Sequence, residues 1–147
     1  MQTPKGVTVW LALWRVTRDI DGLAQNTIAS LGLCPTDFGV LEILLNRGPT
    51  PVNAIAETVM ITSGSMTTAV DRLVARGLAR RTAHAGDARV RLVELTDEGR
   101  ALIDPAYAAH AAAIEQVFEP LTAEERSVLL ASLLKLRRTT RRAKGPS

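Results

Sequence analysis

Apolar side chains recur at steps of three and four through the first third of the chain, which is the spacing of one face of an α-helix. This pattern predicts a long helix over residues 7–30 and a second helix over residues 36–46. Gly32 and Pro35 interrupt the periodicity between the two segments, and the pair Gly48-Pro49 ends the second one. The N-terminal third is therefore expected to be helical.

Two shorter periodic segments follow, over residues 51–59 and 62–76. Thr50 precedes Pro51, an order typical of an N-cap residue and a first-turn proline. Thr62 is placed to cap the next helix, which a glycine ends. Two short helices separated by about three residues form a helix-turn-helix pattern.

The period then changes from helical to alternating. Residues 78–82 and 89–95 are expected to form two strands, and the small, polar residues 84–88 between them the tip of a hairpin. A hairpin directly after a helix-turn-helix is a wing. Helical spacing returns over residues 97–119 and 122–142, with Thr96 at the start of the first segment and a capping box from Thr122 to Glu125 at the start of the second.

The elements together predict a mainly α (α+β) fold, a winged helix-turn-helix with long N- and C-terminal helices. A length of 147 residues suits a single domain, here residues 1–147, with the winged helix-turn-helix at about residues 36–96. The helices near residues 7–30 and 97–142 carry more apolar side chains than one small winged helix can cover. We therefore expect them to be dimerisation helices.

Charge is unevenly distributed, although the net charge is only +3. Six arginines and a single acid, Asp87, lie between Arg72 and Arg91, and a second basic run extends from Lys135 to Lys144. Clusters of this kind favour binding to a polyanion, because each phosphate that they neutralise releases condensed counterions. A solvated basic surface is the alternative for the C-terminal run.

The helix over residues 62–76 places short hydroxyl side chains opposite its apolar face, near the N-terminal end where a helix meets a DNA groove. In isolation such residues only cap and solvate a helix, but the arginine-rich hairpin behind them favours DNA. We assign DNA contacts to nine residues: Thr62, Ser63, Ser65, Thr67, Thr68, Arg72, His84, Arg89 and Arg91. Arg72 is expected to hold phosphate, and Arg89 with His84 to flank a tip that enters the minor groove. Asp87 is expected to pair with a nearby arginine.

The stretch over residues 52–99 resembles the MarR family of bacterial transcription regulators. The resemblance rests on ITSGSMTTAVDRLVARGLARR, followed by DARVRLVELTDEG with its Asp-x-Arg wing running into Val-x-Leu-Thr-x-x-Gly. It implies a homodimer that binds a near-palindromic operator in double-stranded DNA, commonly as a repressor released by a small phenolic or aromatic ligand. The segment LCPTDFGVLEIL and His110 further resemble the quinone- and phenol-responsive branch. Ala88 departs from the pattern, since many members carry adjacent basic residues there.

Two groups of residues allow alternative interpretations. Trp14, Tyr107 and His110 are candidates for an aromatic ligand pocket, but aromatic residues at helical spacing also commonly pack a dimer core. Cys34 precedes a helix that can lower a thiol pKa, but no cationic residue is close in sequence. We interpret Cys34 as a small buried apolar residue.

Other classes of function find little support in the sequence. No nucleophile elbow or phosphate-binding glycine loop is present, so we expect no enzyme, and two histidines with one cysteine predict neither a metal site nor a cofactor. The single cysteine and the absence of an apolar run of about 18 residues favour a cytoplasmic protein without a membrane partner. The remaining alternative is a winged helix that binds another protein and has lost its DNA contacts. Retention on heparin at low salt would distinguish a DNA-binding protein from this alternative.

Overall fold

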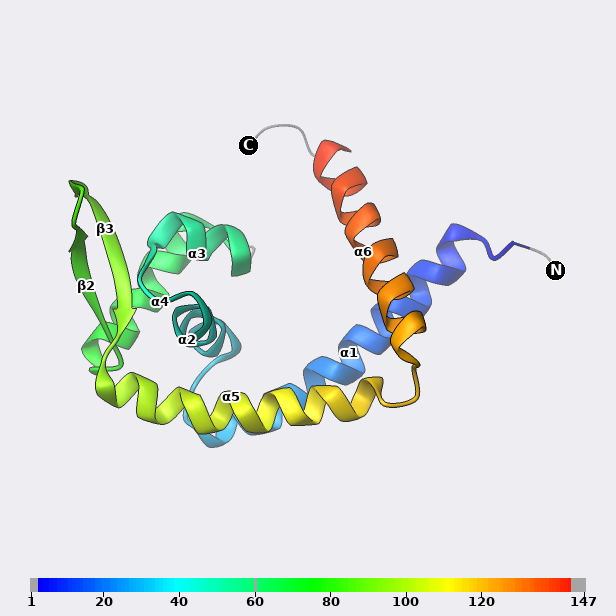
Figure 1. The fold of residues 1–147 in the computed structure, drawn as a ribbon, viewed down its shortest axis with the longest axis horizontal. Coiled ribbons are helices and arrows are strands. Elements are labelled where there is room, and N and C mark those ends of the chain that lie inside the picture. The colour runs from blue at the N-terminus through cyan, green and yellow to red at the C-terminus, as the bar shows by residue number, and fades with distance from the viewer. Residues whose placement is uncertain (1–2, 60, 144–147) are drawn as a thin grey trace.

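The computed structural model describes residues 3–59 and 61–143, and it places a winged helix-turn-helix at one end of a long helical frame (Figure 1). The elements in chain order are α1 (Gly6–Ser30), α2 (Pro35–Arg47), β1 (Thr50–Pro51), α3 (Val52–Val59), α4 (Ser63–Ala75), β2 (Ala79–His84), β3 (Asp87–Leu95), α5 (Asp97–Phe118) and α6 (Ala123–Ala143). The predicted fold class is confirmed.

The hydrophobic core lies within the winged helix-turn-helix. Residues of α2, α3, α4, β3 and the first half of α5 meet there, and the largest fully buried side chains include Leu41, Leu44, Ile55, Leu73 and Ile103. On α4 the buried residues are Met66, Ala69, Val70 and Leu73, which recur at helical spacing along one face. The opposite side of α4 is thereby left facing outward.

The sheet has three antiparallel strands in the order β1-β3-β2. The strand β1 was not expected, because Thr50 was predicted to be the N-cap of the third helix. Thr50 instead pairs with Val93 across the sheet, and its hydroxyl donates to the Gly48 carbonyl at 2.9 Å. Pro51 has no amide hydrogen to offer, which suits a residue on an edge strand.

The predicted wing is present, with longer strands than expected. Its turn contains only Ala85 and Gly86, because His84 belongs to β2 and Asp87 begins β3. The His84 imidazole accepts a hydrogen bond from the Gly86 amide at 3.0 Å through Nδ1, which closes the turn. The tip of the wing is therefore narrower than the five residues predicted.

The helix α5 runs along one edge of the molecule and joins the winged helix-turn-helix to α6, while α1 packs against α5 (Figure 1). The predicted caps at the starts of α5 and α6 are confirmed. Thr96 accepts from the Gly99 amide at 3.0 Å, and Thr122 and Glu125 bond reciprocally to each other's amides at 3.2 and 2.8 Å. Among the described side chains of α6, none is buried.

Candidate nucleic-acid interface

The helix α4 begins with an exposed polar surface. Thr62 caps the helix by accepting from the Ser65 amide at 3.2 Å, and its own hydroxyl donates to the Ser65 hydroxyl at 2.9 Å. Ser63, Ser65, Thr67 and Thr68 are all exposed beside it. A Cβ built onto Gly64 would meet no atom within 4 Å outside its chain neighbours and the backbone of its own helix. The first two turns of α4 thus present small side chains to solvent.

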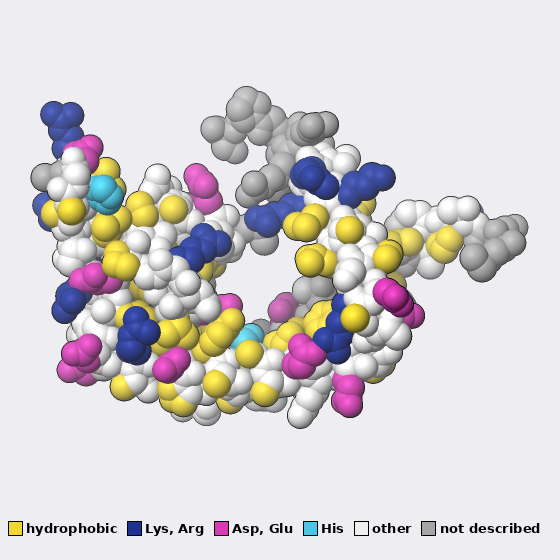
Figure 2. Space-filling model, viewed as in Figure 1, with side chains coloured by type: hydrophobic (Ala, Val, Ile, Leu, Met, Phe, Trp, Pro, Cys, Tyr) yellow, Lys and Arg dark blue, Asp and Glu magenta, His cyan; other side chains and the backbone are white. Residues whose placement is uncertain are grey.

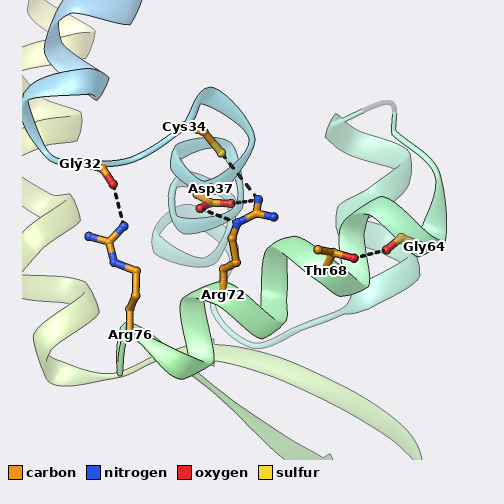
Figure 3. A network of polar contacts seen from close by, with 7 residues as sticks. All are labelled: Gly32, Cys34, Asp37, Gly64, Thr68, Arg72 and Arg76. Atoms are coloured by element: carbon orange, nitrogen blue, oxygen red, sulfur yellow. Dashed lines mark hydrogen bonds and ion pairs between the residues drawn. The ribbon is translucent and has the colours of Figure 1, made fainter.

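The two threonine hydroxyls on this surface have a defined orientation. Thr67 donates to the Ser63 carbonyl at 3.0 Å. Thr68 donates to the Gly64 carbonyl at 3.1 Å, as Figure 3 shows. Because the hydroxyl hydrogen is used within the helix, each oxygen offers its remaining lone pairs outward. These side chains are therefore arranged as hydrogen-bond acceptors.

Two arginines connect the C-terminal half of α4 to the first turn of α2 and to the segment before it. Arg72 forms a two-point ion pair with Asp37, with contacts of 2.6 Å from Nη2 to Oδ1 and 3.3 Å from Nε to Oδ2 (Figure 3). Arg76 donates to the Gly32 carbonyl at 2.8 Å. The hydrogen bond and the negative charge of Asp37 raise the pKa of Arg72 above its ordinary value. These contacts fix the orientation of α4 relative to the rest of the fold.

This arrangement gives Arg72 a structural role, and its expected contact with phosphate stays a prediction, because the Arg72 side chain is still 47% exposed. The Asp37 side chain is only 5% exposed, and Arg72 is the cation that neutralises it. Removing Arg72 would leave a buried carboxylate without its charge partner, which destabilises a protein irrespective of DNA. Arg72 therefore helps to position α4.

The arginines of the wing fall into two groups. Arg80 pairs with Glu94 at 2.6 Å, and Arg81 pairs with Asp71 of α4 at 2.7 Å. Arg89 and Arg91 are exposed, and their guanidinium groups contact no acceptor among the described residues. Asp87 was expected to pair with an arginine side chain, but its carboxylate accepts from the Arg89 backbone amide at 2.9 Å. The paired arginines stabilise the wing, and the other two remain available.

Comparison with known proteins decides the family. The MarR family model matches residues 31–90, which run from the end of α1 into the wing. The HTH-type transcriptional regulator MhqR of Bacillus subtilis is 34% identical over 123 residues, covering 84% of this chain and 85% of the relative. This chain belongs to the MarR family. It is a transcriptional regulator of the MarR type.

Solved structures of other regulators share the fold. A probable transcriptional regulator from Pseudomonas aeruginosa superposes with a TM-score of 0.71 at 30% identity, covering 87% of this chain and 96% of that one. BpsR of Bordetella bronchiseptica, whose DNA binding is regulated by 6-hydroxynicotinic acid, gives a TM-score of 0.73 at 28% identity, with coverages of 88% and 98%. Both similarities extend well beyond the winged helix-turn-helix.

Of the three residues predicted for an aromatic ligand, His110 alone lines a hollow in this MarR-family chain. His110 lines a hollow of about 330 Å³ between α1, α2 and α5, and its ring lies edge-on to Phe38 at 5.3 Å between centroids. Trp14 is 47% exposed on α1, where the Arg18 guanidinium lies 5.0 Å from its ring centroid. Tyr107 is half-buried, and neither it nor Trp14 lines that hollow.

Cys34 was interpreted as a buried apolar residue, and this was wrong. The thiol is exposed, because the chain turns Leu33 into the core and leaves Cys34 outside as the residue before α2. Its sulfur lies 3.7 Å from Nη2 of Arg72 (Figure 3). This neighbour is 38 positions away in sequence, so proximity along the chain could not reveal it.

Metal-binding clusters and membrane-spanning helices are considered for residues 3–59 and 61–143. No group of three or more histidine, cysteine, aspartate or glutamate side chains there is placed to hold a metal ion. No single helix there is long and apolar enough to cross a membrane, although α1 and α2 pass that test together as a pair bent by 85°.

Proposed function

We propose that this regulator is a homodimeric repressor that reads a near-palindromic operator with α4 and is released by a small aromatic ligand. The observation that carries the proposal is the exposed hydroxyl surface on the first two turns of α4, placed beside a wing with two available arginines. In a two-fold dimer each subunit contributes one such helix to one half-site. The half-sites would then lie about 10 base pairs apart, or a little more.

A second copy of the chain is the occupant proposed for the apolar faces of the frame. Large hydrophobic side chains stand exposed along α1 and α6, visible on α6 in Figure 2, and they include Trp10, Trp14, Leu23, Val128, Leu130, Leu134 and Leu136. A monomer rarely keeps so much apolar surface in water. Regulators of this family act as dimers, and α1 and α6 are the elements that a partner subunit would cover.

The hydroxyls of Thr67 and Thr68 suit direct contact with bases. Their oxygens face outward as acceptors, so they complement the amino groups that adenine and cytosine expose in the major groove. Gly64 leaves room for α4 to approach the groove floor. Ser63, Ser65 and the Thr62 cap lie at the same end of the helix and are proposed to contact the backbone or neighbouring base edges.

Replacing Thr68 with alanine is expected to relax base preference at one or two operator positions. The loss should be roughly 1–3 kcal/mol at those positions, because one base contact disappears while the net charge is unchanged. Selection from a randomised operator library, with wild-type protein beside the variant, measures this. The wild-type arm alone tests whether the protein binds DNA with sequence preference.

Thr139→Ala is a matched control for this experiment. Thr139 is also exposed, and its hydroxyl also donates to the carbonyl four positions earlier, at 3.2 Å to Lys135, but it lies on α6. It should leave every operator position unchanged. Equal selection profiles for Thr68→Ala and wild type would refute the role given to Thr68.

The hollow beside His110 is proposed as the effector site. Besides Phe38 and Ile28 it is lined by the carboxylates of Asp21 and Glu42, and no arginine or lysine is among its lining residues. A negatively charged ligand would meet like charges there, whereas a neutral phenol could donate its hydroxyl hydrogen to a carboxylate. The proposed ligand is therefore a neutral phenol or hydroquinone, in contrast to the aromatic acid of BpsR.

Hydroquinone is expected to release the operator at a concentration at least about tenfold lower than 6-hydroxynicotinate does. Such a difference corresponds to about 1.4 kcal/mol of repulsion between the acid and the carboxylates of the hollow. Glu42→Gln should narrow that difference by removing one negative charge from the site. Asp104→Asn, an exposed charge change on α5 outside the hollow, is the control. Fluorescence anisotropy of labelled operator gives the release curves, and stronger release by the acid from the wild type would contradict the proposal.

A further inference from the structure

A groove separates the wing from the start of α3, on the side of the sheet that faces the helices. It encloses about 570 Å³. Its lining residues come from β1, α3, the first position of α4 and β3, and they are Pro51, Val52, Asn53, Ser63, Arg89, Val90 and Arg91. Asn53 was not among the residues that the sequence indicated.

Register directs Arg91 into this groove. Arg91 pairs with Ala83 and Val93 pairs with Arg81, so these four residues share one face of the two-stranded wing. Val93 is fully buried and Arg81 contacts Asp71 of α4, which shows that this face looks toward the helices. Arg91 therefore leaves the sheet on the helix side, one step farther out than Val93.

An irregularity in the wing brings Arg89 to the same place. The pairing shifts between Ala83 and His84, whose partners on β3 are Arg91 and Asp87, so Arg89 lies in the irregular segment. Such bulges re-aim a side chain. The Asp87 carboxylate holds the segment by accepting from the Arg89 amide at 2.9 Å.

The chemistry of the groove fits a phosphodiester. Arg89 and Arg91 supply two positive charges, Asn53 and Ser63 supply neutral hydrogen-bonding groups, and no acidic residue lines the groove. The apolar lining is aliphatic, so it offers no aromatic ring on which a base could stack. The four other arginines of this region each contact an acceptor within the protein.

We propose that this groove holds one backbone phosphate of the DNA strand that passes between α3 and the wing. The proposal rests on the proposed DNA-binding function and deepens it. Arg89 and Arg91 donate hydrogen bonds to the phosphate oxygens, and Asn53 contacts the same phosphate from the opposite wall of the groove. Arg89 thereby acts on the backbone instead of the minor groove, and it contributes affinity without base preference.

Asn53→Asp tests the proposal, because it places a negative charge in the groove without endangering the fold. Asn53 is exposed in the first turn of α3, where an aspartate is favoured by the helix dipole. The variant should melt no lower than wild type and bind operator and unrelated duplex at least about tenfold more weakly. Arg91→Ala should weaken both duplexes by the same factor and reduce the slope of log K against log salt by about 0.9.

Arg80→Ala is the matched control, since it removes the same charge from an arginine that pairs with Glu94. It should lower the salt slope by clearly less than Arg91→Ala does. Equal slopes for the two arginine variants, unchanged binding by Asn53→Asp, or altered base preference in Arg91→Ala would each overturn the phosphate site while leaving DNA binding intact. A wild-type chain that binds neither duplex would overturn the DNA-binding function, and the phosphate site with it.

Discussion

Replacing Gly99 with alanine is expected to unfold this protein or to lower its free energy of unfolding by about 3 kcal/mol or more. A Cβ at this position would lie 1.9 Å from the Leu78 carbonyl oxygen and 2.8 Å from the Leu78 carbonyl carbon. The clashing atoms belong to the backbone, so no side-chain rotation relieves the contact. Urea unfolding followed by circular dichroism measures the loss.

The backbone of Leu78 has little freedom to move away. Its carbonyl accepts from the Thr96 amide at 3.2 Å, and its amide donates to the Leu73 carbonyl at 2.9 Å. The Thr96 hydroxyl donates to the Gly77 carbonyl at 2.6 Å and accepts from the Gly99 amide. The end of α4, the start of the wing and the first turn of α5 therefore meet at one point, which a methyl group on Gly99 would force apart.

Gly64→Ala is the control for this prediction. Gly64 also lies in the first turn of a helix, but beyond its chain neighbours and the backbone of its own helix nothing lies within 4 Å of the added Cβ. Alanine there should leave the unfolding free energy unchanged or raise it by up to about 1 kcal/mol. Equal urea midpoints for Gly99→Ala and wild type would contradict the steric argument.

The features that the sequence predicted well depend on neighbours along the chain. The caps at Thr62, Thr96 and Thr122 each bond to an amide three positions later. The buried face of α4 follows from helical spacing alone. Local patterns of this kind are sufficient to place the helices, the wing and the hydroxyl surface of α4.

The features that the sequence missed depend on contacts between distant segments. Arg72 reaches Asp37 across 35 positions, and Arg76 reaches Gly32 across 44. Thr50 is a strand residue because it pairs with Val93 at the edge of β3. An arginine count cannot separate cations that neutralise a buried acid from cations that remain available, and only the fold makes that division.

The same limit applies to the ligand residues. His110 and Trp14 lie on different helices. Helical spacing shows which residues of one helix share a face, but it does not show which other helix packs against that face. In the fold, α2 brings Phe38 to His110, while Trp14 lies out along α1 with Arg18. Of the three predicted residues, His110 alone lines the proposed effector site.

Replacing Leu130 with aspartate is expected to raise the dissociation constant of the dimer by at least about 100-fold. Leu130 is 58% exposed on α6 in the single chain, so the charge should cost the monomer little. A two-fold interface would bury the new carboxylate twice without a cation to pair with it, which costs roughly 3–5 kcal/mol. Sedimentation velocity over a concentration series measures the shift.

Ala131→Asp separates this effect from a general effect of charge on α6. Ala131 is exposed next to Leu130 and lies 100° around the helix, on the side shared with Lys135. It should leave the dimer intact. Operator binding should weaken in parallel with dimerisation for Leu130→Asp, because a monomer holds one half-site only. A Leu130→Asp protein that remains dimeric at micromolar concentration would show that the apolar face of α6 is not the interface.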